Sequence, residues 1–385
     1  MTSAATILSE GSFHPSLRQG ATQTGVEEVT KRFKKYVPYV FSSHMNDKPD
    51  IEKAGNVNQY RININFFDRL MGHSYLYQVA QRIKKLRIPI VHVRNRPLYM
   101  PTLRKLLGPG VKLVLHEHNQ NIADTLTRKQ AISVLDSIDA YVAVSRFTYD
   151  FEITNRYPEY KQKSRVILNG VNLKKFLPYW EQKNKRAALR GKYGIEGSRN
   201  VLFAGAIRER KGVHTLVEAF KKVVAQMPDA KLIIAGGSKD NTEANDPYAK
   251  KVIRSASEIK DNVVFLGYVP PTNVQDIYML GDIFVGPSQW DEAFGLVFAE
   301  ASASGLAVIG SRRGGIPEII QDGRTGLLIN DPQDKKEIAQ KVISLLESPV
   351  KCQEMGKAAR KRMEDMFSWD RVAKEIEGLY DELLK

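Results

Sequence analysis

The second half of the chain repeats one pattern, in which a short apolar run is followed by a loop and then by an amphipathic stretch with helical spacing. The clearest amphipathic stretch follows Gly212, where apolar side chains recur mostly at gaps of three or four residues until Pro228 ends the pattern. Strands that alternate with helices in this way build a parallel, doubly wound α/β sheet. The strands expected here are 200–205, 230–236, 262–267, 282–285, 306–310 and 326–330.

The first half follows the same alternation, with expected helices that include 25–35 and 75–86. At 385 residues the chain exceeds the roughly 250–300 residues that one hydrophobic core serves, so we expect two domains. Pro178 and a polar run place the connection between them near the start of 172–192. The sequence therefore predicts Rossmann-like domains over 1–172 and 173–367 and a final helix over 368–385. The strands expected in the first half are 38–42, 88–93, 111–116, 140–144 and 165–168.

Several function classes are disfavoured by composition. No window approaches the roughly 18 apolar residues of a membrane span, and the N-terminus lacks a signal-peptide pattern. The single cysteine, Cys352, cannot form an internal disulfide, which fits a reducing compartment. We therefore expect a cytoplasmic protein.

The net charge of +15 is concentrated in the first half, where residues 1–172 carry 25 Lys and Arg against 14 Asp and Glu. Such an excess favours an anionic partner: a phosphate-bearing polymer, an acidic membrane surface or nucleic acid. The alternative is a solvated basic surface. Because no nucleic-acid-binding module is recognisable, we expect no nucleic-acid partner.

A glycine-bounded loop, GAIRERKG at 205–212, lies between an expected strand and the clearest helix. In open parallel sheets, ligands bind beyond the carboxyl ends of the strands. Arg208, Arg210 and Lys211 precede a helix N-terminus, which offers free N–H groups and the positive end of the helix dipole. This combination predicts a diphosphate site, and the alternative is an exposed basic loop.

The strongest local pattern is EAFGLVFAE, in which Glu292 and Glu300 bracket the start of a helix. Carboxylates accept paired hydrogen bonds from vicinal hydroxyls, so one could bind a sugar and the other a ribose. The amides of Phe294, Gly295 and Leu296 could serve the sugar or a phosphate between them. The alternatives are a residue that favours the helix dipole, for Glu292, and a solvated helix face, for Glu300.

These nine residues resemble the Glu-x7-Glu motif of family 4 glycosyltransferases. The stretches VILNGVNLKKF, GAIRERKGVHTLVEAF, FLGYV and SRRGGIPEIIQDGRTGLLI, as well as the pair Pro287 and Ser288, resemble that family in the same order. In the first half, LRQGATQTGVEEV, VHVRNRP and AVSRF resemble the subgroup of spore-coat-associated glycosyltransferases. The resemblance implies the α/β GT-B fold, with two Rossmann-like domains whose parallel sheets face a central cleft and a C-terminal helix that returns to the first domain.

The resemblance also implies roles for single residues. Lys211 matches the lysine that contacts the donor diphosphate, Glu292 the glutamate that binds sugar hydroxyls, and Glu300 the glutamate that holds the ribose. His118 matches the histidine that faces the reacting sugar. His116 is the alternative, and spacing by two puts both on one strand face. The other residues implied at the donor are Gly20, Gly205, Arg208, Gly237, Val269, Phe294, Gly295 and Leu296.

Two positions depart from the family pattern. Ala206 stands where the family usually has arginine, and Gln19 precedes Gly20 where it usually has two glycines. Arg208 or Arg210 could supply the missing charge, and Arg210 is included with Lys211 among the catalytic residues.

The sequence contains no Asp-x-Asp and no metal-ligand spacing, so we expect a metal-independent reaction in which Lys211, an arginine and helix amides meet the charge on the leaving nucleotide. The resemblance implies retention of configuration, by front-face attack or by double displacement with Glu292 as nucleophile. It implies no cofactor beyond a nucleotide-diphosphate sugar, with a UDP-sugar favoured and GDP- or ADP-sugars as alternatives.

The expected acceptor is a glycan, a cell-surface polymer or a lipid-linked molecule. The basic stretches 31–36 and 82–87, both on expected helices, suit an anionic acceptor or peripheral contact with an acidic membrane face. A peripheral position at the inner membrane face or in a spore coat agrees with this interpretation. The competing functions are a non-catalytic or weakly active coat protein with the same fold and a nucleotide-sugar epimerase.

Overall fold

The computed structural model describes all residues except 11, 13–20, 65–73, 198 and 238–245. The chain divides into two compact units, one formed by Met1–Gly170 with Trp369–Lys385 and the other by Val171–Ser368. The first unit is therefore discontinuous in sequence, and helix α16 (Trp369–Leu383) belongs to it. The boundaries expected from the sequence, after 172 and after 367, lie beside those of the two units.

The sheet of the first unit has the strand order β3-β4-β2-β1-β5-β6-β7-β8. All neighbouring strands are parallel except the β3–β4 hairpin. The order reverses at β1, with β2 on one side and β5 on the other, which is where ligands bind in doubly wound folds. The strands are β1 (Thr2–Ile7), β2 (Tyr36–Ser43), β3 (Ile51–Ala54), β4 (Val57–Ile62), β5 (Ile90–Arg94), β6 (Lys112–Glu117), β7 (Ala140–Ala143) and β8 (Ser164–Val166).

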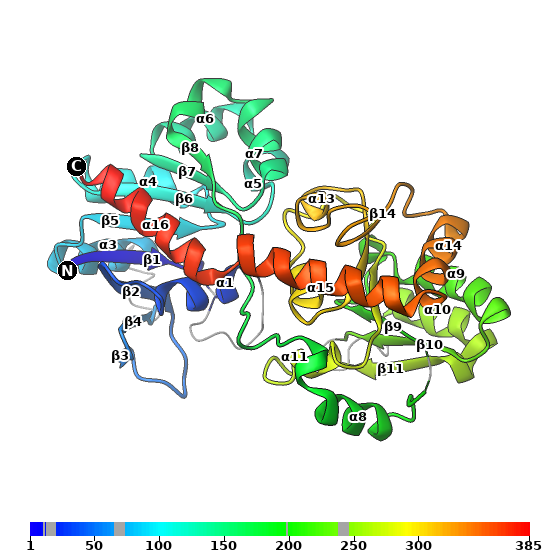
Figure 1. Cartoon of the computed structure of the whole chain (residues 1–385). Helices are drawn as coiled ribbons and strands as arrows, with labels where there is room; N and C mark the ends of the chain where they lie inside the picture. The colour runs from blue at the N-terminus through cyan, green and yellow to red at the C-terminus, as the bar shows by residue number, and fades with distance from the viewer. Residues whose placement is uncertain (11, 13–20, 65–73, 198, 238–245) are drawn as a thin grey trace. The chain divides into compact units, whose positions relative to one another are not determined.

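The two faces of this sheet differ in chemistry because side chains alternate along each strand. Val91, Val93 and Leu115 face an apolar core that includes side chains of α3 (Tyr75–Lys85), α4 (Tyr99–Leu107) and α6 (Arg128–Asp136). The alternate residues of β5 and β6 are the polar side chains His92, Arg94 and His116, all buried. Helices α1 (Ala21–Thr30) and α16 contact one another, and α16 runs across the first unit in Figure 1.

Helix α16 is anchored in the first unit by Tyr380, which is only 1% exposed. Its ring meets Phe33 and Tyr36 edge to face, with centroids 5.9 and 5.2 Å apart, and its hydroxyl lies 2.7 Å from His92 Nδ1. The carboxylate of Glu377 accepts the N–H groups of the segment that leads into β2. The C-terminal helix thus completes the packing of the N-terminal sheet.

One expected helix is wrong in part. The helix expected over 25–35 is α1, which ends at Thr30, and the basic stretch 31–36 forms a turn that enters β2. The physical reason is a distant partner: Glu377 accepts the N–H groups of Lys34 and Lys35 at 2.7 and 2.6 Å, which a continued helix would bond internally. The other basic stretch is helical as expected through Lys85, the last residue of α3.

The sequence also missed three strands of the first unit. Strand β1 reads TSAATI and lacks the large apolar run that marks a buried strand. Strands β3 and β4 form a hairpin around Gly55, whose φ of +61° suits a tight turn, and their residues are largely polar.

The second unit has a fully parallel sheet with the order β11-β10-β9-β12-β13-β14, and all six strands expected from the sequence are present. Its order reverses between β9 and β12. The strands are β9 (Arg199–Ala204), β10 (Ala230–Ala235), β11 (Val263–Gly267), β12 (Ile283–Gly286), β13 (Ala307–Ser311) and β14 (Gly326–Ile329).

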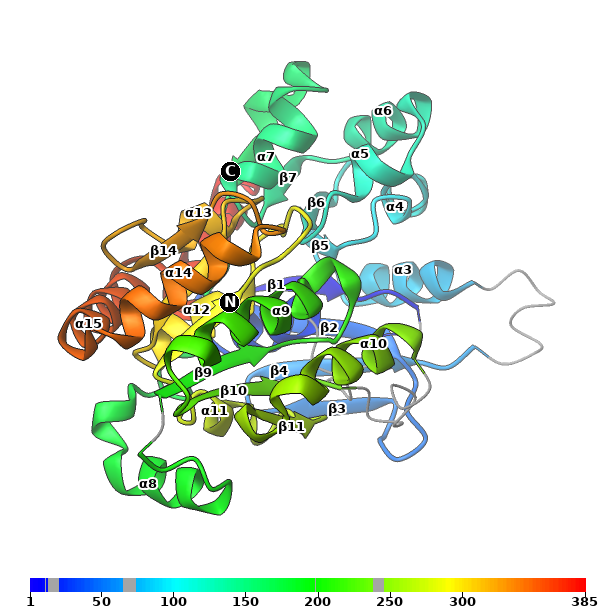
Figure 2. The same ribbon diagram turned by 90° about the vertical axis from the view of Figure 1, so that its right-hand side faces the viewer.

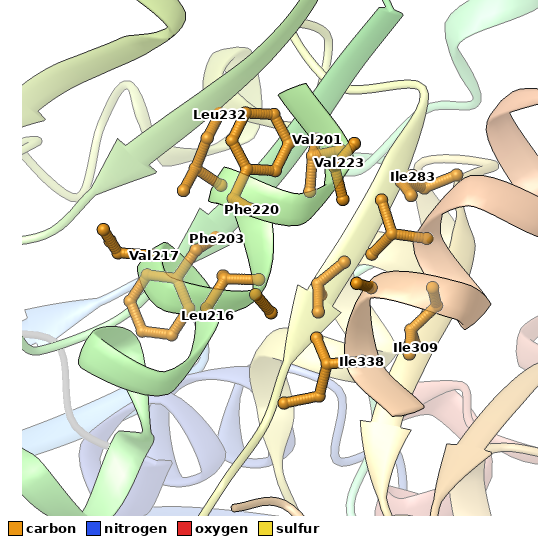
Figure 3. Packing of buried hydrophobic residues seen from close by; sticks show 14 of the residues in the cluster. Val201, Phe203, Leu216, Val217, Phe220, Val223, Leu232, Ile283, Ile309 and Ile338 are labelled. Atoms are coloured by element: carbon orange, nitrogen blue, oxygen red, sulfur yellow. The ribbon is translucent and has the colours of Figure 1, made fainter. Parts of the chain in front are cut away.

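One face of this sheet carries the larger apolar core, in which Phe203 and Leu232 pack with Phe220 of the amphipathic helix α9 (Val213–Gln226) (Figure 3). Helix α10 (Pro247–Ala256) lies beside α9 over the strands (Figure 2), and α14 (Lys335–Leu346) also contacts α9. The opposite face packs against α12 (Leu296–Ala303), whose Phe298 meets Phe284 of β12. The other α-helices of the described residues are α5 (Asn121–Thr125), α7 (Arg146–Tyr149), α8 (Lys183–Lys192), α11 (Val274–Ile277), α13 (Ile316–Ile319) and α15 (Pro349–Met366).

Across the residues that the structure describes, no helix combines the length and the apolarity that a bilayer span requires.

Candidate active site

The loops that follow β9 and β12 meet at the point where the strand order of the second unit reverses. The backbone N–H of Gln289 donates to the carbonyl of Arg210 at 2.8 Å, and Oγ of Ser288 lies 3.3 Å from the same oxygen. The two sequence motifs singled out above therefore form one structure. Their contact depends on the topology, because 81 positions separate Lys211 from Glu292 in the chain.

Gly212 allows this contact. It precedes α9 with a φ of +70°, a conformation that other residues rarely adopt. A Cβ at this position would overlap the carbonyl oxygen of Pro287, so the two loops could not approach as closely. The basic loop expected from the sequence is thus held in place by the loop after β12, although Arg208 and Arg210 remain exposed.

Lys211 and Glu292 form an ion pair, with 2.5 Å between Nζ and Oε1. The Ser288 hydroxyl donates to the same carboxylate oxygen at 3.0 Å. The Lys211 side chain is 24% exposed and that of Glu292 11%, so the pair is shielded from water but open at one side. The carboxylate of Glu292 consequently binds a lysine and a hydroxyl and does not serve only the dipole of α12.

Trp290 lies beside this pair. The guanidinium carbon of Arg210 sits 4.3 Å from the centroid of the Trp290 ring, a cation–π contact, and Lys211 Nζ lies 5.9 Å from it. The indole Nε1 is buried, and within the described parts of the chain no group accepts its hydrogen. A buried N–H without an acceptor costs folding free energy, and at a ligand site such a group is typical of a donor that binds an acceptor on the ligand.

Two glycines support the backbone of the Glu292 loop. Gly315 donates its N–H to the Glu292 carbonyl at 2.7 Å, and Gly314 has a φ of +56°. A Cβ on Gly314 would overlap the backbone of Glu292. The GGIP segment that resembled the family therefore has a physical role, because it fixes the position of the loop that carries Glu292.

The helix expected between the two glutamates is present, because α12 begins at Leu296 directly after Gly295. Its first turn has N–H groups without partners inside the helix. Phe294 is buried and packs against Phe367, with ring centroids 5.9 Å apart. The three backbone amides expected at the donor thus lie on a fixed helix start.

Glu300 lies about one turn after the start of α12 and is half-buried. The Tyr278 hydroxyl donates to its Oε2 at 2.7 Å. Burial raises the pKa of Glu300 to about 7, although the Tyr278 hydroxyl and the Lys175 ammonium act in the opposite direction. Glu300 therefore does not belong to a solvated helix face.

The other residues expected at the donor follow the same edge of the sheet. Gly205, Gly237 and Val269 come after β9, β10 and β11, and Arg208 is exposed on the basic loop, as is Ala206. Gly20 and its neighbour Gln19 lie outside the described residues.

In the first unit, His116 and His118 share one face of the sheet, as the two-residue spacing predicted, and their rings stack with centroids 4.7 Å apart. His118 follows β6, and its backbone N–H donates to Asn95 Oδ1 at 2.6 Å. Its Nε2 lies 3.0 Å from Arg94 Nη1, while His116 Nδ1 lies 3.1 Å from His92 Nε2. Four polar residues of β5 and β6 thus form one buried row that reaches Tyr380 of α16 through His92.

Burial determines the protonation states of the four residues in this row. Desolvation lowers the pKa of His92, His116 and His118 well below the usual value, with the charge of Arg94 acting in the same direction, so the three imidazoles are neutral at neutral pH. Burial also lowers the pKa of Arg94 to about 10, which leaves its guanidinium charged at neutral pH.

Sequence reasoning assigned no role to several residues of these two clusters, one in each unit. Ser288 and Gly314 lay within stretches that matched the family pattern, whereas Tyr278 carried no signal. Arg94 and His92 could have been found, since two polar residues alternate there along an otherwise apolar strand.

Among the described residues, no group of three or more His, Cys, Asp or Glu side chains is arranged to hold a metal ion.

Comparison with known proteins gives two adjacent family matches. Residues 27–175 match the model described as Glycosyltransferase Family 4, and residues 185–362 match the model described as Glycosyl transferases group 1. Together the two matches cover most of both units.

Individual relatives extend over nearly the whole chain. Spore coat protein SA of Bacillus subtilis is 32% identical over 371 residues, which are 95% of this chain and 96% of the relative. The lipopolysaccharide 1,2-N-acetylglucosaminetransferase of Salmonella typhimurium is 28% identical over 382 residues, 94% of each chain. The crystal structure of HepE from Anabaena in complex with UDP-glucose superimposes with a TM-score of 0.79 at 16% identity, covering 99% of this chain and 100% of that one.

Two doubly wound units, the first completed by the C-terminal helix, form the GT-B fold of glycosyltransferases. The chain belongs to family 4 of these enzymes, as its whole-length relatives and both family matches establish.

Proposed function

We propose that this protein is a retaining, metal-independent glycosyltransferase that moves a sugar from a nucleotide-diphosphate sugar to a glycan, a cell-surface polymer or a lipid-linked acceptor. The observation that carries the proposal is the Lys211–Glu292 ion pair at the reversal of the strand order, with Glu300 on the helix that follows. A purely structural loop would need neither a shielded ion pair nor the unpaired indole N–H beside it.

The charges suit a leaving diphosphate. Lys211, the neighbouring Arg210 and the N-terminus of α9 place positive charge where the departing nucleotide gains negative charge. Glu292 and Trp290 both contact Lys211, which fixes the direction of its ammonium group. Because these groups supply the positive charge, the proposal needs no metal ion.

The carboxylates suit hydroxyl groups. Glu292 would accept hydrogen bonds from the transferred sugar, and Glu300 from the ribose of the nucleotide. Two donors already occupy Oε1 of Glu292, which favours a binding role over a nucleophilic one. We therefore favour front-face attack, in which the departing phosphate oxygen receives the acceptor proton, over a double displacement through Glu292.

We favour a UDP-sugar as the donor because HepE, which shares the fold, was crystallised with UDP-glucose; GDP- and ADP-sugars are the alternatives. The test is a screen of these nucleotide sugars for release of nucleotide diphosphate and formation of glycoside, in buffer with excess EDTA. We expect turnover with a UDP-sugar, full activity in EDTA and a product of retained anomeric configuration. Activity that depends on added manganese or magnesium, or an inverted product, would contradict the proposal.

The pKa of Glu300 predicts a pH dependence of donor binding. The carboxylate form accepts two hydroxyl hydrogens, whereas protonation removes one acceptor, so donor KM should rise as the pH falls through about 7. Below that pH the rise approaches about tenfold per pH unit if only the ionised form binds. The measurement is donor KM from pH 5.5 to 8.5.

Glu300→Gln is the matched control for this prediction, since an amide keeps the size and cannot ionise. It should give a high donor KM that does not change with pH. An unchanged wild-type slope in Glu300→Gln would assign the titration to another group.

For the acceptor we propose an anionic polymer or lipid-linked glycan bound by the first unit. The cations of the 31–36 turn are largely paired, for example Lys31 with Glu28 at 2.5 Å and Lys35 with Asp381 at 2.6 Å. By contrast, Lys84 and Lys85 at the end of α3 are exposed and, within the described residues, form no ion pair. The end of α3 is therefore the better candidate surface, and it could also make peripheral contact with an acidic membrane.

Salt should weaken this attraction, because exposed charges act over a Debye length of about 10 Å at 0.1 M ionic strength. We expect acceptor KM to rise with salt, and the double variant Lys84→Ala/Lys85→Ala to raise KM at low salt and to flatten the dependence. The double variant Lys351→Ala/Lys357→Ala removes two exposed lysines of the second unit and should leave KM unchanged. Equal effects of the two double variants would show that only the net charge matters.

A non-catalytic coat component is the second candidate, favoured by the name of the relative from Bacillus subtilis and by Ala206 in place of the usual arginine. The donor screen separates the two, since such a protein would bind a nucleotide sugar without turnover or not bind it at all.

A further inference from the structure

Arg94 and His118 make an unusual buried contact. The guanidinium Nη1 of Arg94 lies 3.0 Å from the imidazole Nε2 of His118, and both residues are at least 96% buried. Among the described residues no carboxylate lies within ion-pair distance of Arg94, so this cation is turned toward a neutral ring instead of an acid. Gly25 of α1 closes the contact from one side, since a Cβ there would lie 3.4 Å from both Arg94 Nη1 and His118 Cε1.

The contact permits only one arrangement of hydrogens. A guanidinium has five N–H donors and no acceptor, so His118 Nε2 must accept the hydrogen bond and cannot carry a hydrogen. A neutral imidazole then carries its hydrogen on Nδ1. A second positive charge on the ring would face Arg94 at hydrogen-bond distance, which excludes the doubly protonated form.

The Nδ1–H of His118 is left without a partner. The nitrogen is buried, and in the part of the chain that the structure describes no acceptor lies within reach of it. The ring cannot turn freely, because its face stacks on His116 and its backbone is bonded to Asn95. A donor is therefore oriented at a fixed place beyond β6, near the reversal of the first sheet.

We propose that Arg94 is a positioning residue that holds His118 as the neutral Nδ1–H tautomer, so that the imidazole donates a hydrogen bond to a hydroxyl or phosphoryl oxygen of a substrate bound at this edge of the first sheet and does not act as a base. The catalytic part of this inference rests on the proposed function. The tautomer itself depends only on the Arg94 contact.

The tautomer can be measured directly by NMR on protein labelled with 15N in its 7 histidines. The 15N shifts and the couplings to ring protons distinguish a protonated from an unprotonated ring nitrogen, and the spectrum of His118→Gln identifies the His118 signals. We expect Nε2 of His118 to be unprotonated and Nδ1 protonated at pH 7.5. A protonated Nε2 would overturn the inference whatever the enzymatic activity.

Arg94→Met and Arg94→Lys form the matched pair of variants. Lysine is also a donor only, so it should preserve the tautomer, whereas methionine fills similar volume, offers no donor and should allow the Nε2–H form to appear. Loss of an unpaired buried charge should not unfold the protein, and the melting temperature of each variant checks this.

The same pair tests the role in catalysis. With a donor that the wild type uses, Arg94→Met should lower kcat about 100-fold with a smaller change in donor KM, and Arg94→Lys should recover most of the loss. An unchanged tautomer in Arg94→Met, or a changed tautomer with unchanged kcat, would overturn the inference. If the wild type transfers no sugar, the proposed function fails, but the NMR result still decides the tautomer.

Discussion

Replacement of Lys211 with methionine should lower sugar transfer by about 10²–10³-fold while the fold remains intact. Lys211 places its charge at the N-terminus of α9, beside the strand-order reversal, where the leaving diphosphate would develop negative charge. The same ammonium holds Glu292 at 2.5 Å, so its loss also removes the partner that positions the carboxylate proposed to bind the sugar. Both effects act on the transition state, and we expect kcat to fall more than donor affinity.

Lys221→Met is the matched control, since Lys221 lies in the helix that follows Lys211, is 21% exposed against 24% for Lys211, and pairs with Glu218 and Glu258. It should transfer sugar at the wild-type rate. The measurements are steady-state kinetics and thermal melting of both variants, and Glu292→Gln should behave like Lys211→Met. Near wild-type turnover in Lys211→Met with an intact fold would remove the central support for the proposed site.

The largest effect on stability should come from Tyr380→Ala in the C-terminal helix. The ring is fully buried against Phe33 and Tyr36, so its removal should cost about 3–5 kcal/mol of unfolding free energy in the first unit. Because the two units have separate cores, we expect the transition of the first unit to move to lower denaturant while that of the second stays in place.

Tyr380→Phe separates the ring from its hydroxyl. It leaves the packing and removes the 2.7 Å contact with His92 Nδ1, which should cost about 1–3 kcal/mol. Tyr193→Ala, at an exposed tyrosine of the second unit, should have little effect. Chemical denaturation followed by tryptophan fluorescence measures all three variants, and a shift of both transitions in Tyr380→Ala would contradict the assignment of α16 to the first unit alone.

The sequence predicted the fold well wherever local pattern decides structure. In the second unit the apolar strands and the stripe of α9 are read directly from spacing, because the strands other than the edge strand β11 are largely buried on both faces. Strand β1 was missed because its small residues Ala4, Ala5 and Thr6 are buried by the strands on both sides and form no large apolar run of their own. The 31–36 turn was predicted as helix because Glu377, 343 positions from Lys34, is invisible to any local pattern.

The residues of the candidate site could be predicted where they belong to a recognisable sequence motif. Lys211, Glu292 and Glu300 were predicted from motifs. The ion pair between Lys211 and Glu292, however, depends on the strand order and on the positive φ of Gly212. Tyr278 could not be found from the sequence. Its hydrogen bond to Glu300 joins the end of α11 to α12, and no local spacing relates the two residues. The tautomer of His118 requires the register of β5 against β6, which no single strand reveals.

The discontinuity of the first unit sets the order in which the chain can fold during translation. Residues 171–368 form the second unit in one uninterrupted stretch, so it can complete its core as soon as that stretch has left the ribosome. Most of the first unit is synthesised earlier, but it lacks α16 until residues 369–383 emerge, and until then Phe33, Tyr36 and His92 lack their contacts with Tyr380. The unit that is synthesised first is therefore the unit that finishes folding last. On the nascent chain, the sheet face that α16 will cover is exposed, and chaperones could bind there.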